Sequence, residues 1–338
     1  MRDILETVQG WIADSRRIAL ATVTETWGSA PRGVGAKMAV TGETAIIGSV
    51  SGGCVETAVI GECLATLKDG KVRLLQYGVS DDNACEVGLT CAGRMGVLVE
   101  PLDLTWWQTV VARTGQEKPA ITLTVLSGEH AGAKALSDGA TLLYTNGLPE
   151  MAHEAFADAG AAALQSGRSE IAGMEVLIDV QRPRPHLIVI GGVHIAMPLA
   201  QFAQIVGFRV SIVDPREVFA TPERFPGASA ISHRYPDRAL PDLGIDADTY
   251  VAVLTHDPKI DDKALITALP SPARYIGVLS SRKTHEKRLV RLREAGLSEE
   301  LLARIHTPIG LDIGARTPEE IAVGIMAEIL AVRNGKMR

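Results

Sequence analysis

The sequence predicts an α/β protein: an N-terminal α+β domain followed by a doubly wound parallel sheet. From residue 186 onward, short apolar runs alternate with segments of helical periodicity, a pattern typical of parallel strands joined by covering helices. Before residue 181, apolar runs are separated by glycine-rich turns and lack that alternation. Residues 181–185 (QRPRP) contain two prolines, which favour an extended linker between the two parts.

The chain length of 338 residues fits two domains. We predict an N-terminal domain over residues 1–180, a linker over residues 181–185 and a C-terminal domain over residues 186–338. The N-terminal domain is expected to have a core over about residues 1–103, followed by a middle stretch rich in strand-like runs.

In the N-terminal domain, apolar runs predict strands over residues 18–24, 36–40, 44–50 and 96–100. One helix is predicted from about residue 54 to residue 68. Cys63 shares a face of that helix with Val59 and Leu67, so we expect it to pack in the core. The middle stretch contains ITLTVLSG, ATLLY and MEVLIDV, which predict further strands.

In the C-terminal domain, residues 186–192 (HLIVIGG) predict a buried strand that ends in glycines. A helix over residues 194–206 and strands over residues 208–214, 250–256 and 274–280 follow. Near the end, Thr317, Pro318 and Glu320 have the spacing of a capping box. We therefore expect a helix to begin there and to dock its apolar residues onto the sheet.

Composition excludes several classes of protein. A net charge of −6 gives no basic surface for nucleic acid, and no apolar run approaches the length of a membrane span. The first residues lack the basic start and apolar block of a signal peptide, and four cysteines cannot form a disulfide framework. We expect a cytoplasmic protein with neither nucleic acid nor a membrane as partner.

The first candidate site lies in the N-terminal domain. Residues 48–56 (GSVSGGCVE) predict a strand, a double-glycine turn and a helix start near Cys54. Unpaired N–H groups at a helix start favour a thiolate or a phosphate, although a buried cysteine beside a structural turn fits the pattern equally well. In residues 28–35 (GSAPRGVG), Arg32 is placed to meet a phosphate or carboxylate, or the loop simply ends a hairpin.

Two further cysteines, Cys85 and Cys91, lie in a glycine-containing loop. Their spacing of six residues matches no common zinc or iron–sulfur ligand pair. A thiolate ligand, a sulfur carrier and no role at all remain open for them.

The second candidate site follows the strand over residues 186–192. The sequence GGVHIA, which includes Gly191 and His194, takes the place of a dinucleotide-binding G-x-G-x-x-G/A turn. Asp214 lies at the position of a ribose contact, but Val193 occupies the slot where a glycine lets the pyrophosphate approach, which weakens NAD(P) binding. At the end of the strand predicted over residues 250–256, His256 and Asp257 are expected to line a pocket. Local capping by Asp257 is the alternative.

The motifs together resemble one family. GSAPRGVGAKMAV (28–40), GSVSGGCVE, GLTCAG (88–93) and VEP (99–101) are similar to the N-terminal domain of the XdhC/CoxI family. IGGVHIA (190–196), VDPR (213–216), THDPKID (255–261), ARYIGVLSSRKT (273–284) and PIGLDIGARTPEEIAVGIMAEI (308–329) resemble its Rossmann-like C-terminal domain. The order of the motifs matches over nearly the whole chain.

The resemblance implies a maturation chaperone without turnover chemistry of its own. Such a protein binds molybdenum cofactor, either as molybdopterin or in a dinucleotide form, protects it, supports its sulfuration and inserts it into a xanthine dehydrogenase-family hydroxylase. The implied partners are that hydroxylase, a cysteine desulfurase and a second copy of the chain. By matching position, the resemblance assigns cofactor contacts in the N-terminal domain to Arg32, Ser51, Gly52, Gly53, Cys54 and Cys91, with both cysteines as metal ligands.

The chain departs from the family pattern at Val193 in the glycine turn, at Ala92 after the second cysteine and at Ser280 before the Ser-Arg pair. The first and third departures weaken nucleotide binding by the C-terminal domain. Two other classes of function remain as alternatives: an NAD(P)-dependent oxidoreductase and a thiol- or metal-based sensor.

Overall fold

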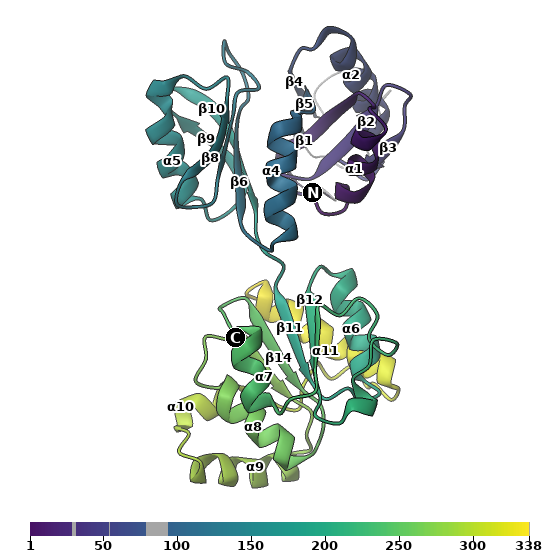
Figure 1. Ribbon diagram of the computed structural model, residues 1–338, viewed down its shortest axis with the longest axis vertical. Coiled ribbons are helices and arrows are strands. Elements are labelled where there is room, and N and C mark those ends of the chain that lie inside the picture. The colour runs from purple at the N-terminus through teal and green to yellow at the C-terminus, as the bar shows by residue number, and fades with distance from the viewer. Residues whose placement is uncertain (29–31, 54, 79–93, 338) are drawn as a thin grey trace. The chain divides into compact units, whose positions relative to one another are not determined.

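The computed structural model of the chain describes residues 1–28, 32–53, 55–78 and 94–337. The chain divides into two compact units, Met1–Pro183 and Arg184–Arg338 (Figure 1). Each unit has hydrophobic cores of its own. Within the described residues, no helix combines the length and the apolar character that crossing a membrane requires.

The first half of unit 1 is an antiparallel sheet with the strand order β3-β2-β1-β5-β4. Its residues alternate between two faces, as the pleat requires. Ala19, Ala21 and Val23 pack against helix α2, whereas Ile18 and Leu20 pack with helices α1 and α4. The elements are α1 (Leu5–Ala13), β1 (Ile18–Trp27), β2 (Lys37–Thr41), β3 (Ile46–Gly48), α2 (Glu56–Asp69), β4 (Arg73–Tyr77), β5 (Arg94–Pro101) and α4 (Leu104–Gly115).

Cys63 is fully buried in α2, between Val59 and Leu67, as its spacing predicted. Burial raises the pKa of its thiol to about 12. Cys63 is therefore a packing residue that stays protonated near neutral pH.

The second half of unit 1 is another antiparallel sheet, with the order β8-β7-β6-β10-β9 and helix α5 packed on it. The strands predicted in this stretch are present, but the helices α4 and α5 were not foreseen. The elements are β6 (Ala120–Val125), β7 (Lys134–Ser137), β8 (Leu142–Asn146), α5 (His153–Ala162), β9 (Gly167–Ile171) and β10 (Met174–Gln181), with a 3-10 turn η1 (Glu150–Ala152) before α5.

Buried polar contacts join the two sheets of unit 1. Lys37 Nζ lies 2.7 Å from Asp179 Oδ2, and Lys134 Nζ lies 2.5 Å from Glu100 Oε2. All four side chains are at most 6% exposed. Each pair has one residue in each sheet, so both sheets contribute to one packed body.

Unit 2 is a doubly wound sheet of parallel strands in the order β13-β12-β11-β14-β15-β16, which confirms the predicted fold class. Helices α6 and α11 cover one face of the sheet, and α7 and α8 cover the other (Figure 1). The strand order reverses between β11 and β14, where this fold usually binds its ligands.

The strands of unit 2 are β11 (His186–Ile190), β12 (Arg209–Val213), β13 (Ala230–Ser232), β14 (Thr249–Val253), β15 (Tyr275–Val278) and β16 (Ile305–His306). Its helices are α6 (Ala196–Ile205), α7 (Pro236–Leu243), α8 (Pro258–Ala268), α9 (Arg282–Glu294), α10 (Glu299–Leu302) and α11 (Pro318–Arg333), with a 3-10 turn η2 (Glu217–Phe219) after β12. The predicted capping box at the start of α11 is confirmed: Glu320 N donates to Thr317 Oγ1, and Thr317 N donates to Glu320 Oε2.

Candidate functional site

The turn between β3 and α2 converges on one carboxylate, that of Glu56. Its Oε1 accepts hydrogen bonds from Ser51 N and Gly52 N, each at 2.9 Å, and from Ser49 Oγ at 2.7 Å. Its Oε2 accepts from Gly53 N at 2.8 Å and from Ser51 Oγ at 2.5 Å. The residues from Ser49 to Gly53 therefore form an anion-binding turn, and Glu56 supplies the anion.

This arrangement changes the expectation for the helix start. The helix begins at Glu56, two residues later than predicted, and Val55 at its N-cap has no side-chain cap. Burial by itself would raise the pKa of Glu56. Hydrogen bonds from Ser51 and Ser49 outweigh burial and lower this pKa from 4.5 to about 2. The N–H groups that we expected to meet a phosphate thus bind an ionised side chain of the protein, and an external phosphate has to compete with it.

Glu56 was missed in the sequence, although a signal for it was present. It lies three residues after the second glycine of the turn and in the first turn of the predicted helix, where an acidic side chain reaches back to free N–H groups.

Arg32 lies beside this turn. Its Nε donates to the carbonyl oxygen of Ser49 at 3.1 Å, and its Nη2 donates to Asp3 Oδ2 at 2.8 Å. The structure therefore places Arg32 against Ser49, the first residue of the turn that contains Ser51, Gly52 and Gly53. Gly52 and Gly53 are exposed, with φ of 91° and 130°, and no atom of the described residues lies within 4 Å of a Cβ built at Gly53.

The cysteines predicted for this site, Cys54 and Cys91, lie outside the described residues, and so does Cys85. Within residues 1–28, 32–53, 55–78 and 94–337, no group of three or more His, Cys, Asp or Glu side chains is arranged to hold a metal ion.

In unit 2, the predicted residues follow three neighbouring strands at the carboxyl edge of the sheet. The glycines after β11 are required by the protein's own packing. A Cβ at Gly191, whose φ is 104°, would lie 2.4 Å from Thr255 Cγ2. A Cβ at Gly192 would lie 2.1 Å from the carbonyl oxygen of Phe219. These close approaches explain the glycine pair without a nucleotide.

Asp214, which follows β12, is completely buried and bonded within the protein. Its Oδ2 accepts from Gly192 N at 2.9 Å and from Arg216 Nη2 at 2.7 Å, and its Oδ1 accepts from Arg216 N and Nε. Burial raises the pKa of Asp214, but the hydrogen bonds from Arg216 and Gly192 lower it overall. Both oxygens expected to contact a ribose are thus engaged by neighbouring residues.

The other residues predicted for this edge differ in role. His194 and His256 are exposed, and His256 has a φ of 64°. Asp257 accepts a hydrogen bond from Lys259 N at 2.9 Å and is the N-cap of α8. The capping role, given above as the alternative for Asp257, is the one that the structure shows.

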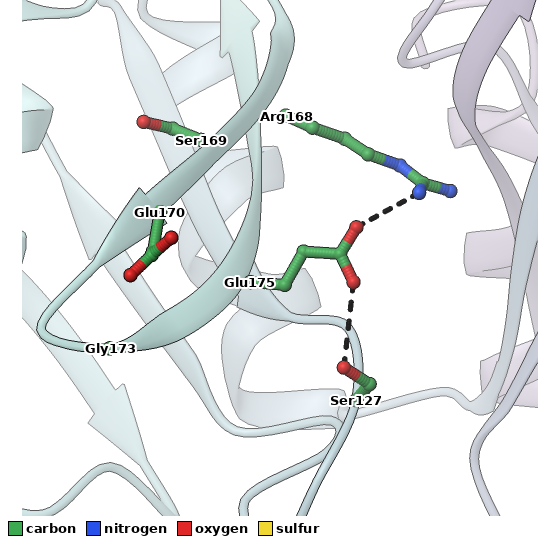
Figure 2. A pocket seen from close by; sticks show the side chains of 6 residues that line it. All are labelled: Ser127, Arg168, Ser169, Glu170, Gly173 and Glu175. Atoms are coloured by element: carbon green, nitrogen blue, oxygen red, sulfur yellow. Dashed lines mark hydrogen bonds and ion pairs between the residues drawn. The ribbon is translucent and has the colours of Figure 1, made fainter.

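A polar cavity of about 470 Å³ lies elsewhere in unit 1 (Figure 2). Glu175 accepts hydrogen bonds there from Arg168 at 2.9 Å and from Ser127 at 3.5 Å. None of the predicted site residues lines this cavity, and its central charged groups bond to each other.

Comparison with protein-family models gives two matches along the chain. Residues 11–78 match the model described as the XdhC and CoxI family, and residues 187–329 match that described as the XdhC Rossmann domain.

Three curated relatives are similar over nearly the whole chain. A protein of Bacillus subtilis (strain 168), described as a probable subunit of xanthine dehydrogenase, is 28% identical over 337 residues, covering 95% of each chain. The molybdenum cofactor insertion chaperone PaoD of Escherichia coli (strain K12) is 26% identical, covering 98% of this chain and 88% of its own. The uncharacterized protein YqeB of the same strain is 28% identical over 94% of this chain, which spans only 43% of its length.

A crystal structure of a Bacillus halodurans protein, described as a xanthine dehydrogenase, has a TM-score of 0.80 to this chain. The match covers 99% of this chain and 96% of the other at 24% sequence identity. At that identity, the likeness establishes a shared fold alone.

Proposed function

The chain belongs to the XdhC and CoxI family, and from this premise we propose that it binds molybdenum cofactor and helps to mature a xanthine dehydrogenase-type hydroxylase. The observation that carries the proposal is the similarity to PaoD, a molybdenum cofactor insertion chaperone, over 98% of this chain. A match of that extent includes both units rather than a single common fold.

The turn beside Arg32 fits one part of the cofactor, its phosphate. The N–H groups of Ser51, Gly52 and Gly53 already hold an oxyanion, the carboxylate of Glu56, so their donor chemistry suits a phosphate oxygen. Glu56 would have to turn away from Ser51 to admit it. Arg32, whose guanidinium is partly exposed, would add a charged donor at the same place.

The thiolates of Cys54 and Cys91 would supply soft ligands for molybdenum or for a sulfur atom. Their assignment rests on the motifs SGGCVE and GLTCAG. The proposal further includes support for sulfuration, with a cysteine desulfurase as the sulfur donor, insertion into the client hydroxylase, and a homodimer as the working form. Molybdopterin and its dinucleotide form are both compatible with a phosphate held at this turn.

The test is the cofactor content of the purified protein. We expect anaerobic purification from a host that makes molybdenum cofactor to give near-equimolar pterin, detected by fluorescence after acid–iodine oxidation, and molybdenum. Absence of pterin, even after anaerobic incubation with supplied cofactor, would refute the proposal.

Cysteine variants test the site itself. Cys54→Ala and Cys91→Ala are expected to lower pterin retention, whereas Cys63→Ala is the matched control because its thiol is buried in the core. Equal retention in all three variants would overturn the cysteine assignment.

One observation supports the NAD(P)-dependent oxidoreductase as the second candidate, namely the strand order of unit 2. Against it, Asp214 is bonded to Arg216 and Gly192 rather than free for a ribose. Tight NAD(P)H binding with hydride transfer to a substrate would favour this candidate over the chaperone.

A further inference from the structure

Arg288, in α9, has hydrogen-bonding capacity that the described residues do not use. Its side chain is 2% exposed, and its Nη2 donates to Asp261 Oδ2 at 3.0 Å. Within the part of the chain that the structure describes, Nε and Nη1 have no hydrogen-bond partner. Because a buried donor without an acceptor is destabilising, these two nitrogens call for an acceptor from outside the described residues.

The guanidinium is directed at the start of α8. Asp261 belongs to the first turn of that helix, is 1% exposed, and accepts a second hydrogen bond from Thr255 Oγ1 at 2.5 Å. Thr255 follows β14 and contacts Gly191, which follows β11. Arg288 is therefore linked through Asp261 and Thr255 to the point where the strand order reverses.

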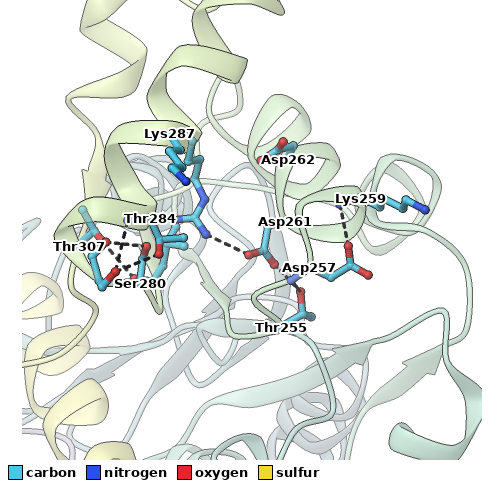
Figure 3. A network of polar contacts seen from close by, with 12 residues as sticks. Thr255, Asp257, Lys259, Asp261, Asp262, Ser280, Thr284, Lys287 and Thr307 are labelled. Atoms are coloured by element: carbon cyan, nitrogen blue, oxygen red, sulfur yellow. Dashed lines mark hydrogen bonds and ion pairs between the residues drawn. The ribbon is translucent and has the colours of Figure 1, made fainter.

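The face of α9 that carries the buried Arg288 also carries exposed residues near the start of the helix. Ser281, Thr284 and Arg288 are three and four residues apart, so they lie on one face of the helix. Side chains of a helix tilt toward its N-terminus, which brings the Arg288 side chain back toward the exposed Ser281 and Thr284. In Figure 3, Thr284 and Ser280 lie on one side of this network, and Asp261 and Thr255 lie on the other.

The charge at this end of α9 suits an anion. Lys283 and Lys287 are carried on the first two turns of α9, and the N-terminus of this 13-residue helix has partial positive charge. A phosphoryl group has several acceptor oxygens and can satisfy donors on different nitrogens of one guanidinium. The glycine turn after β11 is less suited to a phosphate. The Phe219 carbonyl occupies the space beside Gly192 that a nucleotide would use, and Arg216 is bonded to the Asp214 carboxylate.

We propose that Arg288 is the base of a phosphoryl-binding site at the carboxyl end of β14 and β15, entered past Ser281 and Thr284. The ligand class is a phosphate-bearing small molecule. The site lies wholly in unit 2 and is independent of molybdenum cofactor binding by unit 1, so either proposal can fail without the other.

The test is calorimetric titration of the full chain, purified without cofactor, with pyrophosphate and separately with ADP at fixed ionic strength. Wild-type protein is expected to show saturable binding. Arg288→Lys keeps the charge but loses the fork of donors, and it is expected to weaken binding at least tenfold. The matched control is Arg291→Lys on the same helix, because Arg291 Nε and Nη2 are already bonded to Asp262 at 2.5 and 2.9 Å.

The two probes separate the sources of the phosphoryl group. Equal affinity for pyrophosphate and ADP shows that the phosphoryl group alone is recognised. Tighter binding of ADP shows that the phosphoryl group is carried on a nucleoside. Either outcome supports the site if Arg288→Lys weakens the binding. No saturable binding of either probe overturns the proposal. So does equal weakening by Arg288→Lys and Arg291→Lys, or loss of binding in Arg32→Lys but not in Arg288→Lys.

A second measurement keeps the proposal testable if Arg288→Lys does not fold. In wild-type protein labelled with ¹⁵N-arginine, the buried Arg288 Nε–H should give a resonance protected from solvent exchange. That resonance is expected to shift during the pyrophosphate titration, and a resonance that stays in place at saturating probe refutes the site.

Discussion

Replacing Glu56 by glutamine should weaken unit 1 and change its response to acid. The glutamine keeps the shape of the side chain but exchanges one acceptor oxygen for an NH₂ group. That group would face the N–H and hydroxyl donors of Ser51, Gly52 and Gly53, which now point at carboxylate oxygens. At least one of these donors would lose its acceptor.

The magnitude follows from the pKa of Glu56, which is lowered from 4.5 to about 2. A difference of that size corresponds to roughly 3 kcal/mol, and solvent screening of a partly exposed carboxylate reduces the expected contribution to about 1–2 kcal/mol. Because the folded-state pKa is depressed, this stability is present above pH 4.5 and is lost as the pH falls toward 2. Glu56→Gln should therefore lower stability at pH 7 and flatten its pH dependence below pH 4.5.

Tryptophan fluorescence during urea unfolding measures this directly, because all four tryptophans lie in unit 1. The control is Glu62→Gln on the same helix, which removes a partly exposed ion pair with Arg73 and should cost no more than about 0.5–1 kcal/mol. If Glu56→Gln matches this control at pH 7, or if its acid sensitivity equals that of wild type, the role assigned to the Glu56 carboxylate is wrong.

Other perturbations test the remaining contacts. Gly192→Ala should destabilise unit 2 by about 3 kcal/mol or more, seen as a lower calorimetric Tm, because its Cβ would overlap the Phe219 carbonyl. Burial lowers the pKa of His186 from 6.5 to about 4; its ring resonances should titrate near pH 4 by NMR, and unit 2 should lose about 3 kcal/mol between pH 6.5 and 4. Lys37→Met should cost unit 1 about 3–5 kcal/mol by leaving Asp179 buried without its cation. Pairing it with Asp179→Leu should restore most of the loss in the same urea assay, and no recovery would argue against a specific ion pair.

The sequence predicts unit 2 better than unit 1, for a physical reason. Parallel strands are buried on both faces, so the run over residues 187–190 is continuously apolar and stands out from the helices beside it. The capping box at Thr317 and Glu320 is a local signal, because the residues that form it are three positions apart.

The helix α4 was missed because strand-like runs dominate the stretch around it. Its signals are nonetheless in the sequence: Asp103 caps Trp106 N at 3.0 Å, and Trp106, Trp107, Val110 and Thr114 repeat at helical spacing. Two adjacent tryptophans have low helix propensity, so the segment is helical mainly because its apolar face is buried against the first sheet.

The sequence suggests residue types for the candidate sites but does not predict the contacts of those residues. The approach of Arg32 to Ser49 and the contact of Gly191 with Thr255 depend on chain segments that are distant in sequence. The partners of Asp214 and the orphaned nitrogens of Arg288 depend on burial, which no short motif encodes. Such features follow from the tertiary arrangement and become visible only when the segments are brought together.

The buried ion pairs between the two sheets of unit 1 limit where the protein can be divided into fragments that fold. A fragment ending near residue 103 would carry Lys37 and Glu100 without Asp179 and Lys134, and would expose to water the surface that these charges now share. Each orphaned charge would either hydrate by opening the sheet or draw the fragment into aggregates. Expression of the halves as separate proteins should therefore cut between Pro183 and Arg184, where the two compact units meet along the chain.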